Sequence, residues 1–155
     1  CQRHTHAVKR LKLLQLQPET ASRETWRIVG QAVITQEDYE AGRVFEDAVA
    51  SMYYPVDLHT EAGVRPKHLR EGTVVTIPLG ALIPKGSRNL LVAGRCVSSD
   101  RLANSGLRVQ ASCMAMGQAA GAAAALSAAD KSTPSELSIT ELRRVLRDHG
   151  AIVPA

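Results

Sequence analysis

The sequence is poor in several residue types that particular protein classes require. Only 3% of its 155 residues are aromatic, and its lysines and arginines are dispersed along the chain. A protein that binds nucleic acid usually gathers its positive charge on one face and interleaves rings on which bases stack. The net charge of +4 therefore gives no reason to expect a nucleic-acid partner.

Cysteine is scarce as well. The three cysteines, Cys1, Cys96 and Cys113, are widely spaced and include no Cys-x-x-Cys pair. This spacing suggests neither a disulfide framework nor a zinc site. We therefore expect reduced thiols, no bound metal and a cytoplasmic location.

Long, strongly apolar runs are also missing. The most apolar stretch, residues 111–129, consists mainly of alanine and is interrupted by Ser112, Gln118 and Ser127. A membrane-spanning helix needs roughly twenty strongly apolar residues. The stretch therefore predicts a buried helix of a soluble protein, and we expect no membrane partner.

Apolar periodicity predicts the elements of the first half of the chain. Near-helical spacing indicates the end of a helix over residues 7–17. Because no cap precedes this helix and the first residue is not methionine, we expect the chain to be cut from a larger protein. A β-branched run predicts a strand over 23–34, in which Gly30 marks a bulge or a close backbone approach. Thr35 then caps a short helix, and helical spacing predicts another over 44–52.

The second half alternates extended and helical patterns. Residues 89–94 form a short apolar run ended by glycine, which is typical of a strand buried on both faces in a parallel sheet. Residues 109–129 predict the longest helix, and the residues between these two segments are expected to form a loop. The remaining expected segments are an extended stretch, a loop, a strand, a connector and a capped terminal helix, over 53–59, 60–72, 73–78, 79–87 and 140–147. The chain is thus expected to have a mixed α/β fold.

A strand end beside a helix with a bare face is a candidate cofactor cradle. Ligands of open α/β sheets bind at the carboxyl ends of strands, and Gly94 lies at such an end. Because residues three or four apart share a helix face, another backbone or a flat ligand can approach that face closely where side chains are small. The alternative is that the face simply packs the helix against a sheet. The small residues at this spacing are Gly117, Ala120, Gly121, Ala124 and Ala128.

Together these segments resemble the FAD-dependent oxidoreductase family, whose two-domain fold is like that of glutathione reductase and the fumarate reductase flavoproteins. The most specific words are Asn-Leu-Leu-Val-Ala-Gly-Arg-Cys over 89–96 and Met-Gly-Gln-Ala-Ala-Gly within 116–124. The order of these motifs along the chain is as specific as each motif. The other matching segments are 23–25, 27–30, 35–38, 54–59, 77–79, 82–85, 98 and 107–109.

The resemblance implies an FAD site. It implies that Gly94 and Arg95 meet the ribityl and pyrophosphate part of FAD, and that the flavin ring faces the start of the long helix. It also implies that Ser98 and Arg108 fix the intervening loop, with Cys96 either near the flavin or packed inside. The implied cofactor-binding residues are Gly94, Arg95, Cys96, Ser98, Arg108, Gly117, Gln118 and Ala119.

The family's nucleotide-binding motif is missing from this chain. No Gly-x-Gly-x-x-Gly occurs in the sequence, so the resemblance covers the C-terminal portion of a two-domain flavoprotein that lacks its N-terminal Rossmann half. That half is the expected partner, and the chain alone should bind FAD weakly or not at all. The expected divisions are residues 1–72 in the substrate or cap domain, 73–129 in the FAD-binding domain, and 130–155 as linker and terminal helix.

Three basic residues are candidates for handling a small-molecule substrate. In an extended segment Arg23 and Arg27 share one face and could hold a carboxylate between them; the alternative is a solvated face paired with acidic residues. Asp57 and His59 also share a face, so the carboxylate could orient the imidazole for proton transfer. The alternative is an exposed or structural histidine.

The expected function follows from the resemblance. In the intact protein FAD would accept a hydride from a carbon that bears a hydroxyl or amine, or from an activated C–H bond. Arg23, Arg27 and His59 are the candidate catalytic residues. The competing hypothesis is a non-catalytic α/β module that binds or assembles with a partner through its alanine-rich helix.

Overall fold

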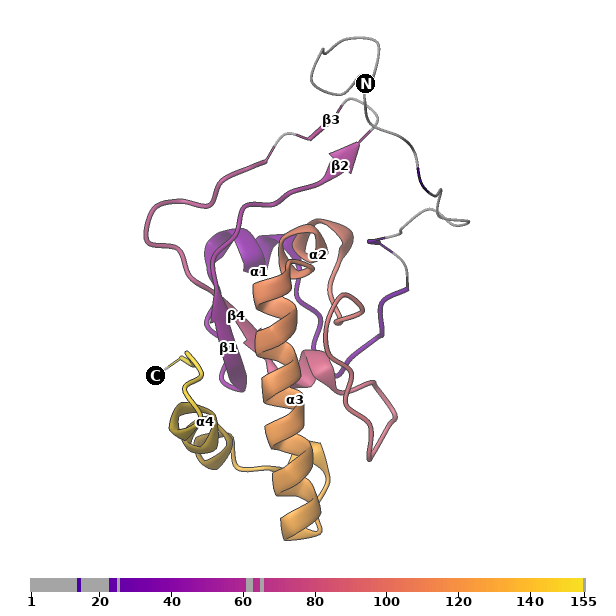
Figure 1. The fold of residues 1–155 in the computed structure, drawn as a ribbon, viewed down its shortest axis with the longest axis vertical. Helices are drawn as coiled ribbons and strands as arrows, with labels where there is room; N and C mark the ends of the chain where they lie inside the picture. The colour runs from indigo at the N-terminus through magenta and orange to yellow at the C-terminus, as the bar shows by residue number, and fades with distance from the viewer. Residues whose placement is uncertain (1–13, 15–22, 25, 61–62, 65, 155) are drawn as a thin grey trace.

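The long helix α3 (Gln110–Asp130) runs through the middle of the molecule. The computed structural model describes residue 14 and residues 23–24, 26–60, 63–64 and 66–154, so the helix expected over 7–17 falls almost entirely outside this part. Figure 1 shows the short helices α1 (Gln36–Ala41) and α2 (Arg101–Leu107) near the first turns of α3. The last helix, α4 (Ile139–Asp148), lies beside its second half.

Two small antiparallel pairs of strands complete the fold. Strand β1 (Ala48–Met52) pairs with β4 (Val75–Pro78), with a register shift near the start of β1. Strands β2 (His59–Thr60) and β3 (Gly63–Val64) form a hairpin that extends away from the body. The mixed α/β class is confirmed. The division expected after residue 72 stays a prediction, and the β1–β4 pair joins residues from both sides of it.

Where the sequence carries local capping chemistry, the expected helices are confirmed. The Thr35 side chain accepts from the backbone of Asp38, whose carboxylate accepts from the Thr35 backbone in turn, so α1 begins with a capping box. Gly42, at φ +66°, ends the same helix in the left-handed region. The terminal helix α4 is likewise capped by Ser138.

The helix expected over 44–52 is wrong, because most of that segment is strand β1. Ala48, Val49 and Ala50 are buried one after another. Consecutive burial requires cover on both faces of a strand, whereas a surface helix buries every third or fourth residue. Pairing with β4 and packing against α3 therefore decide this segment, and its apolar spacing does not.

The strand expected over 23–34 is not formed: the described residues of this segment make only isolated bridges, at Gly30 to Pro84 and at Ile34 to Ser99. Its backbone bonds alternate between two neighbours, since the Ile28 N–H donates to Cys96 and the Gln31 N–H donates to Ile83. A Cβ at Gly30 would lie 2.8 Å from the Cβ of Ser98 and 2.9 Å from the Gly80 carbonyl oxygen. The close backbone approach expected at Gly30 is confirmed.

The strand expected over 89–94 is also wrong in this structure. These residues form no strand, and Leu90 is 51% exposed. The Val92 N–H donates to the Leu82 carbonyl on one side. A buried strand needs neighbours at both edges and on both faces, and the described residues do not supply them.

The loop expected after Ser98 contains the helix α2. Its first turn is capped by Asp100, whose carboxylate accepts from the Ala103 N–H at 2.8 Å. Five of the seven residues of α2 are buried, among them Asn104 and Ser105. This helix therefore belongs to the interior, and Ser105 and Arg108 from it and its C-terminal cap contact the backbone of Asp57.

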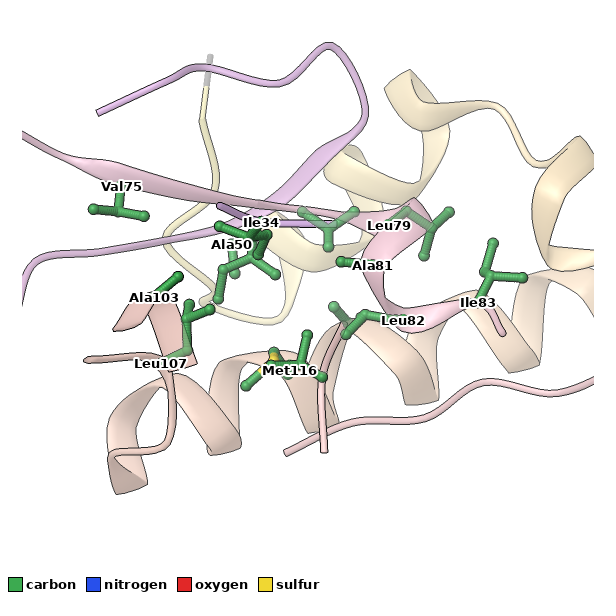
Figure 2. Close-up of a cluster of buried hydrophobic side chains, with 14 of the residues drawn as sticks. Ile34, Ala50, Val75, Leu79, Ala81, Leu82, Ile83, Ala103, Leu107 and Met116 are labelled. Carbon is green, nitrogen blue, oxygen red and sulfur yellow. The ribbon is translucent and has the colours of Figure 1, made fainter. Parts of the chain in front are cut away.

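The core fills the space between α3, the β1–β4 pair and α2. Figure 2 shows Met116 of α3, Leu107 of α2, Ile34 and Leu82 pointing toward one another. These side chains are fully buried, and burial of a large aliphatic side chain contributes about 1.5–3 kcal/mol. Among the residues that the structure describes, no helix combines the length and apolar character that a bilayer crossing demands.

Gly106 of α2 is the position where packing tolerates a side chain least. A Cβ at Gly106 would overlap the hydroxyl of buried Tyr39, which donates to the Tyr54 carbonyl oxygen at 2.9 Å. We expect Gly106→Ala to lower the free energy of unfolding by about 1–3 kcal/mol, because the ring must shift. Gly121→Ala is the matched control, since a Cβ there meets open space and alanine is favoured in a helix by up to ~1 kcal/mol. Urea unfolding measures both, and equal stabilities would contradict this packing.

Candidate functional site

The structure brings Arg23 beside Asp57 and His59, which lie two residues apart in the sequence. The Arg23 guanidinium Nη2 lies 3.0 Å from His59 Nδ1 and 3.2 Å from His59 Nε2. The Asp57 carboxylate Oδ2 lies 3.5 Å from His59 Nε2. The imidazole is partly exposed and therefore accessible to a small molecule. We call Arg23, Asp57 and His59 the Arg23–His59 cluster.

One protonation pattern suits both the shorter Arg23 contact and the Asp57 contact of His59. A neutral imidazole has one N–H donor and one acceptor nitrogen. Arg23 can only donate, and the ionised Asp57 carboxylate can only accept. Nδ1, the ring nitrogen nearer to Arg23, is therefore assigned as the acceptor, and Nε2 carries the proton that faces Asp57.

Arg27 has a different partner from Arg23. Its Nε donates to the Ser99 carbonyl oxygen at 3.1 Å. It lines an open cavity of about 450 Å³ with the exposed Trp26 and with Ser98. The carboxylate clamp expected from Arg23 and Arg27 therefore stays a prediction, and it would need Arg27 to leave Ser99.

Arg108 is buried beneath the Arg23–His59 cluster. The residue is 6% exposed, and its Nη2 donates to the Asp57 carbonyl oxygen at 2.9 Å. The same nitrogen lies 3.4 Å from Glu24 Oε1. Arg108 was expected to fix the loop beside FAD. That role stays a prediction, and in this structure the side chain contacts the segments that carry Arg23 and His59.

Two glycines among the cofactor-binding candidates face open space. Gly94 has φ +98°, which favours glycine, and no atom lies within 4 Å of the position that a Cβ would take. A Cβ at Gly117 would likewise meet nothing. Arg95 and Gln118 are exposed beside them, although Gln118 Nε2 donates to the His149 carbonyl oxygen. These four residues leave open surface at the end of 89–94 and on the flank of α3, and their expected contacts with FAD stay predictions.

Two other candidates are committed to the interior. Ser98 is fully buried, and its hydroxyl oxygen accepts from the Gly30 N–H at 2.9 Å. Ala119 is fully buried and faces the core. The cofactor contacts expected of these two residues stay predictions. Both side chains hold the fold together beside the proposed site.

Gly117 lies inside α3 and not among its first residues. The helix begins at Gln110, so Gly117 lies in its third turn. Only the first four N–H groups of a helix lack partners within it. Gly117 therefore offers a surface without side chains, but not the free N–H groups expected from a helix start.

The small residues of α3 leave one side of the helix open. Gly117, Gly121, Ala124 and Ala128 are exposed, and Ala120 is half-buried. The tight packing of this face against a sheet, weighed as the alternative, is wrong within the described residues. The side chains that face the core are Ser112, Met116, Ala119, Ala123 and Ser127. An open cavity of about 790 Å³ lies between the last turns of this face and residues 88–91.

The two described cysteines are free and half-buried. Cys96 Sγ lies 3.8 Å from the Ala93 carbonyl oxygen. Burial raises the pKa of the Cys113 thiol, and the nearby Arg95 charge only partly opposes this. Cys113 is therefore a poor nucleophile at neutral pH. No group of three or more His, Cys, Asp or Glu residues within the described ranges is arranged to hold a metal ion.

Comparison with known protein families identifies the family of this chain. The model of the family described as FAD dependent oxidoreductase matches residues 2–146. The chain therefore belongs to the FAD-dependent oxidoreductases. No curated protein and no solved structure matches it.

Ser98→Ala tests whether this residue supports the fold. The substitution leaves the buried Gly30 N–H without its partner, so we expect the free energy of unfolding to fall by about 1–3 kcal/mol. Ser135→Ala removes the exposed hydroxyl that accepts from Gln31 and should change stability by less than about 0.5 kcal/mol. Thermal and urea unfolding of the two variants supply the comparison. A Ser98→Ala protein as stable as the control would show that the hydrogen bond from Gly30 to Ser98 does not contribute to stability.

Proposed function

We propose that this chain is the C-terminal part of an enzyme that transfers a hydride from a small organic substrate to FAD. The observation that carries the proposal is the contact of Arg23 with His59, backed by the carboxylate of Asp57. The family match supports the oxidoreductase class. Reduced thiols at Cys96 and Cys113 support a cytoplasmic setting.

Four residues would hold the cofactor. Gly94 and Arg95 would lie against its ribityl and pyrophosphate part, and Gly117 and Gln118 against the flavin ring. The free space at both glycines supports this placement. When bound, FAD supplies the acceptor for a hydride from carbon.

The Arg23–His59 cluster would handle the substrate. Arg23 would bind an acidic group of the substrate through charge-assisted hydrogen bonds. His59 Nδ1 would take the proton from the hydroxyl or amine on the carbon that loses its hydride. The nearby Asp57 carboxylate would stabilise the imidazolium that forms.

The proposed partner of this chain is a nucleotide-binding Rossmann half. Two adjacent surfaces support it: the bare face of α3 and the residues 89–94 that form no strand. Leu90 is 51% exposed and Met114, next to the bare face, is 75% exposed. A strand beside 89–94 and a helix against Ala124 and Ala128 would cover both surfaces and leave Gly117 to the flavin.

A non-catalytic assembly module is the second candidate, and the same open face favours it. The two functions differ in what fills the space at Gly117. An enzyme requires flavin there, whereas an assembly module requires only a protein surface. Flavin content of the protein expressed together with its nucleotide-binding half therefore separates them.

Replacing Gly117 tests the position of the ring. In the protein expressed with its nucleotide-binding half, Gly117→Leu should abolish the visible absorbance of bound flavin, because the side chain fills the open space. Ala129→Leu is the control, since it enlarges another exposed side of α3. Unchanged flavin in both variants would contradict the placement. A colourless, folded wild-type protein would favour the assembly module.

A further inference from the structure

The segments that carry Arg23 and His59 have little regular structure of their own. Residues 23 and 24 form a bend, and His59 begins a strand of only two residues. A two-stranded hairpin alone is marginally stable. The distance between Arg23 and His59 must therefore be set by what lies beneath them, and that element is α2.

The helix α2 holds the backbone of Asp57 on both sides of the residue. The Asp57 N–H donates to the Ser105 hydroxyl at 3.0 Å, and its carbonyl oxygen accepts from Arg108 Nη2 at 2.9 Å. Ser105 and Arg108 are buried, so water competes little for these bonds. His59 follows two residues later, and its position is fixed by this attachment.

The same guanidinium also reaches the segment of Arg23. Glu24 lies between two arginines at either end of α2, with Oε2 at 3.4 Å from Arg101 Nε and Oε1 at 3.4 Å from Arg108 Nη2. Arg101 is exposed, and its pairing with Glu24 is weakened by solvent. The Arg108 side chain is only 5% exposed, so its attraction to Glu24 is screened less.

We propose that Arg108 is a positioning residue for the substrate-binding pair. Its guanidinium joins the Glu24 carboxylate to the Asp57 backbone, and this link sets the contact between Arg23 Nη2 and His59 Nδ1. The role in catalysis rests on the proposed function, but the link itself does not. It keeps Nδ1 engaged until an acidic substrate group draws Arg23 away, which then leaves Nδ1 free to accept a proton.

A coupling experiment on the 155-residue chain tests this link. Histidine labelled with ¹⁵N gives ring-nitrogen signals, and His59→Gln identifies the signal of His59. In the wild-type background, Arg23→Gln should shift the Nδ1 resonance, because it removes the donor at 3.0 Å. In the Arg108→Met background, most of that shift should be lost, since the pair is already apart.

Arg143→Met is the matched control. Arg143 of α4 is also a partly buried arginine that donates to backbone carbonyls, of Ala48 and Glu46, at the opposite end of the molecule from β2. The full Arg23→Gln shift should remain in this background even where stability falls. Loss of the shift in both backgrounds would show a general loosening and would overturn the positioning role.

Two further outcomes are decisive. A folded Arg108→Met protein that keeps the full Arg23→Gln shift overturns the proposal. If Arg108→Met does not fold, Glu24→Gln replaces it, because this substitution removes the charge at 3.4 Å from Arg108 and keeps the shape of the side chain. Loss of the Arg23→Gln shift in that background supports the proposal, and retention of the shift overturns it. Flavin content is not measured in this experiment, so its outcome is independent of whether the chain serves an FAD enzyme.

Discussion

The approach of three backbone segments at Gly30 governs the rest of this structure. Gly30 lies so close to Ser98 and to the Gly80 carbonyl that no side chain fits between them. The Ser98 hydroxyl satisfies the Gly30 N–H at the same point. The segment 26–34 is thereby held between 80–85 and 96–100.

One side of the long helix is packed against the core, and the other side is exposed. One side of α3 buries Met116 and Ala119 against the core. The other presents Gly117 and Gly121 to open space. The exposed side of a helix usually carries polar residues, or a neighbouring element covers it. The exposed side of α3 carries glycine and alanine instead. Small residues allow a backbone or a flat ring to approach, so the open side is suited to close contact rather than to solvent.

The sequence predicted local structure better than it predicted long-range pairing. The helix capped by Thr35 and the long helix depend on residues within a few positions, and both are confirmed. Strand β1 and residues 89–94 depend on neighbours distant in sequence, and their apolar spacing was misleading. The helix α2 was expected to be a loop, because its burial depends on packing against segments distant in sequence.

The candidate site shows the same division. The spacing of Asp57 and His59 predicted that they share a face, and their side chains do lie together. No spacing could bring Arg23 to His59 across 36 residues, or give Arg108 a place under both, since these contacts exist only after α2 has packed. The expectation that Arg23 and Arg27 act as one clamp assumed a regular strand, and the structure gives the two guanidinium groups separate partners.

The helix α2 also connects the proposed cofactor side to the Arg23–His59 cluster. Buried Asn104 donates to the Arg95 carbonyl oxygen at 3.1 Å and to the Ser99 hydroxyl at 3.3 Å. Arg27 donates to the carbonyl of the same Ser99. The backbone that follows Gly94 is thus tied to the helix whose other end carries Arg108. In the proposed enzyme these hydrogen bonds would connect the residues beside the cofactor to those beside the substrate. Hydride transfer needs a fixed separation of substrate and cofactor, because the reacting atoms must be held within contact distance.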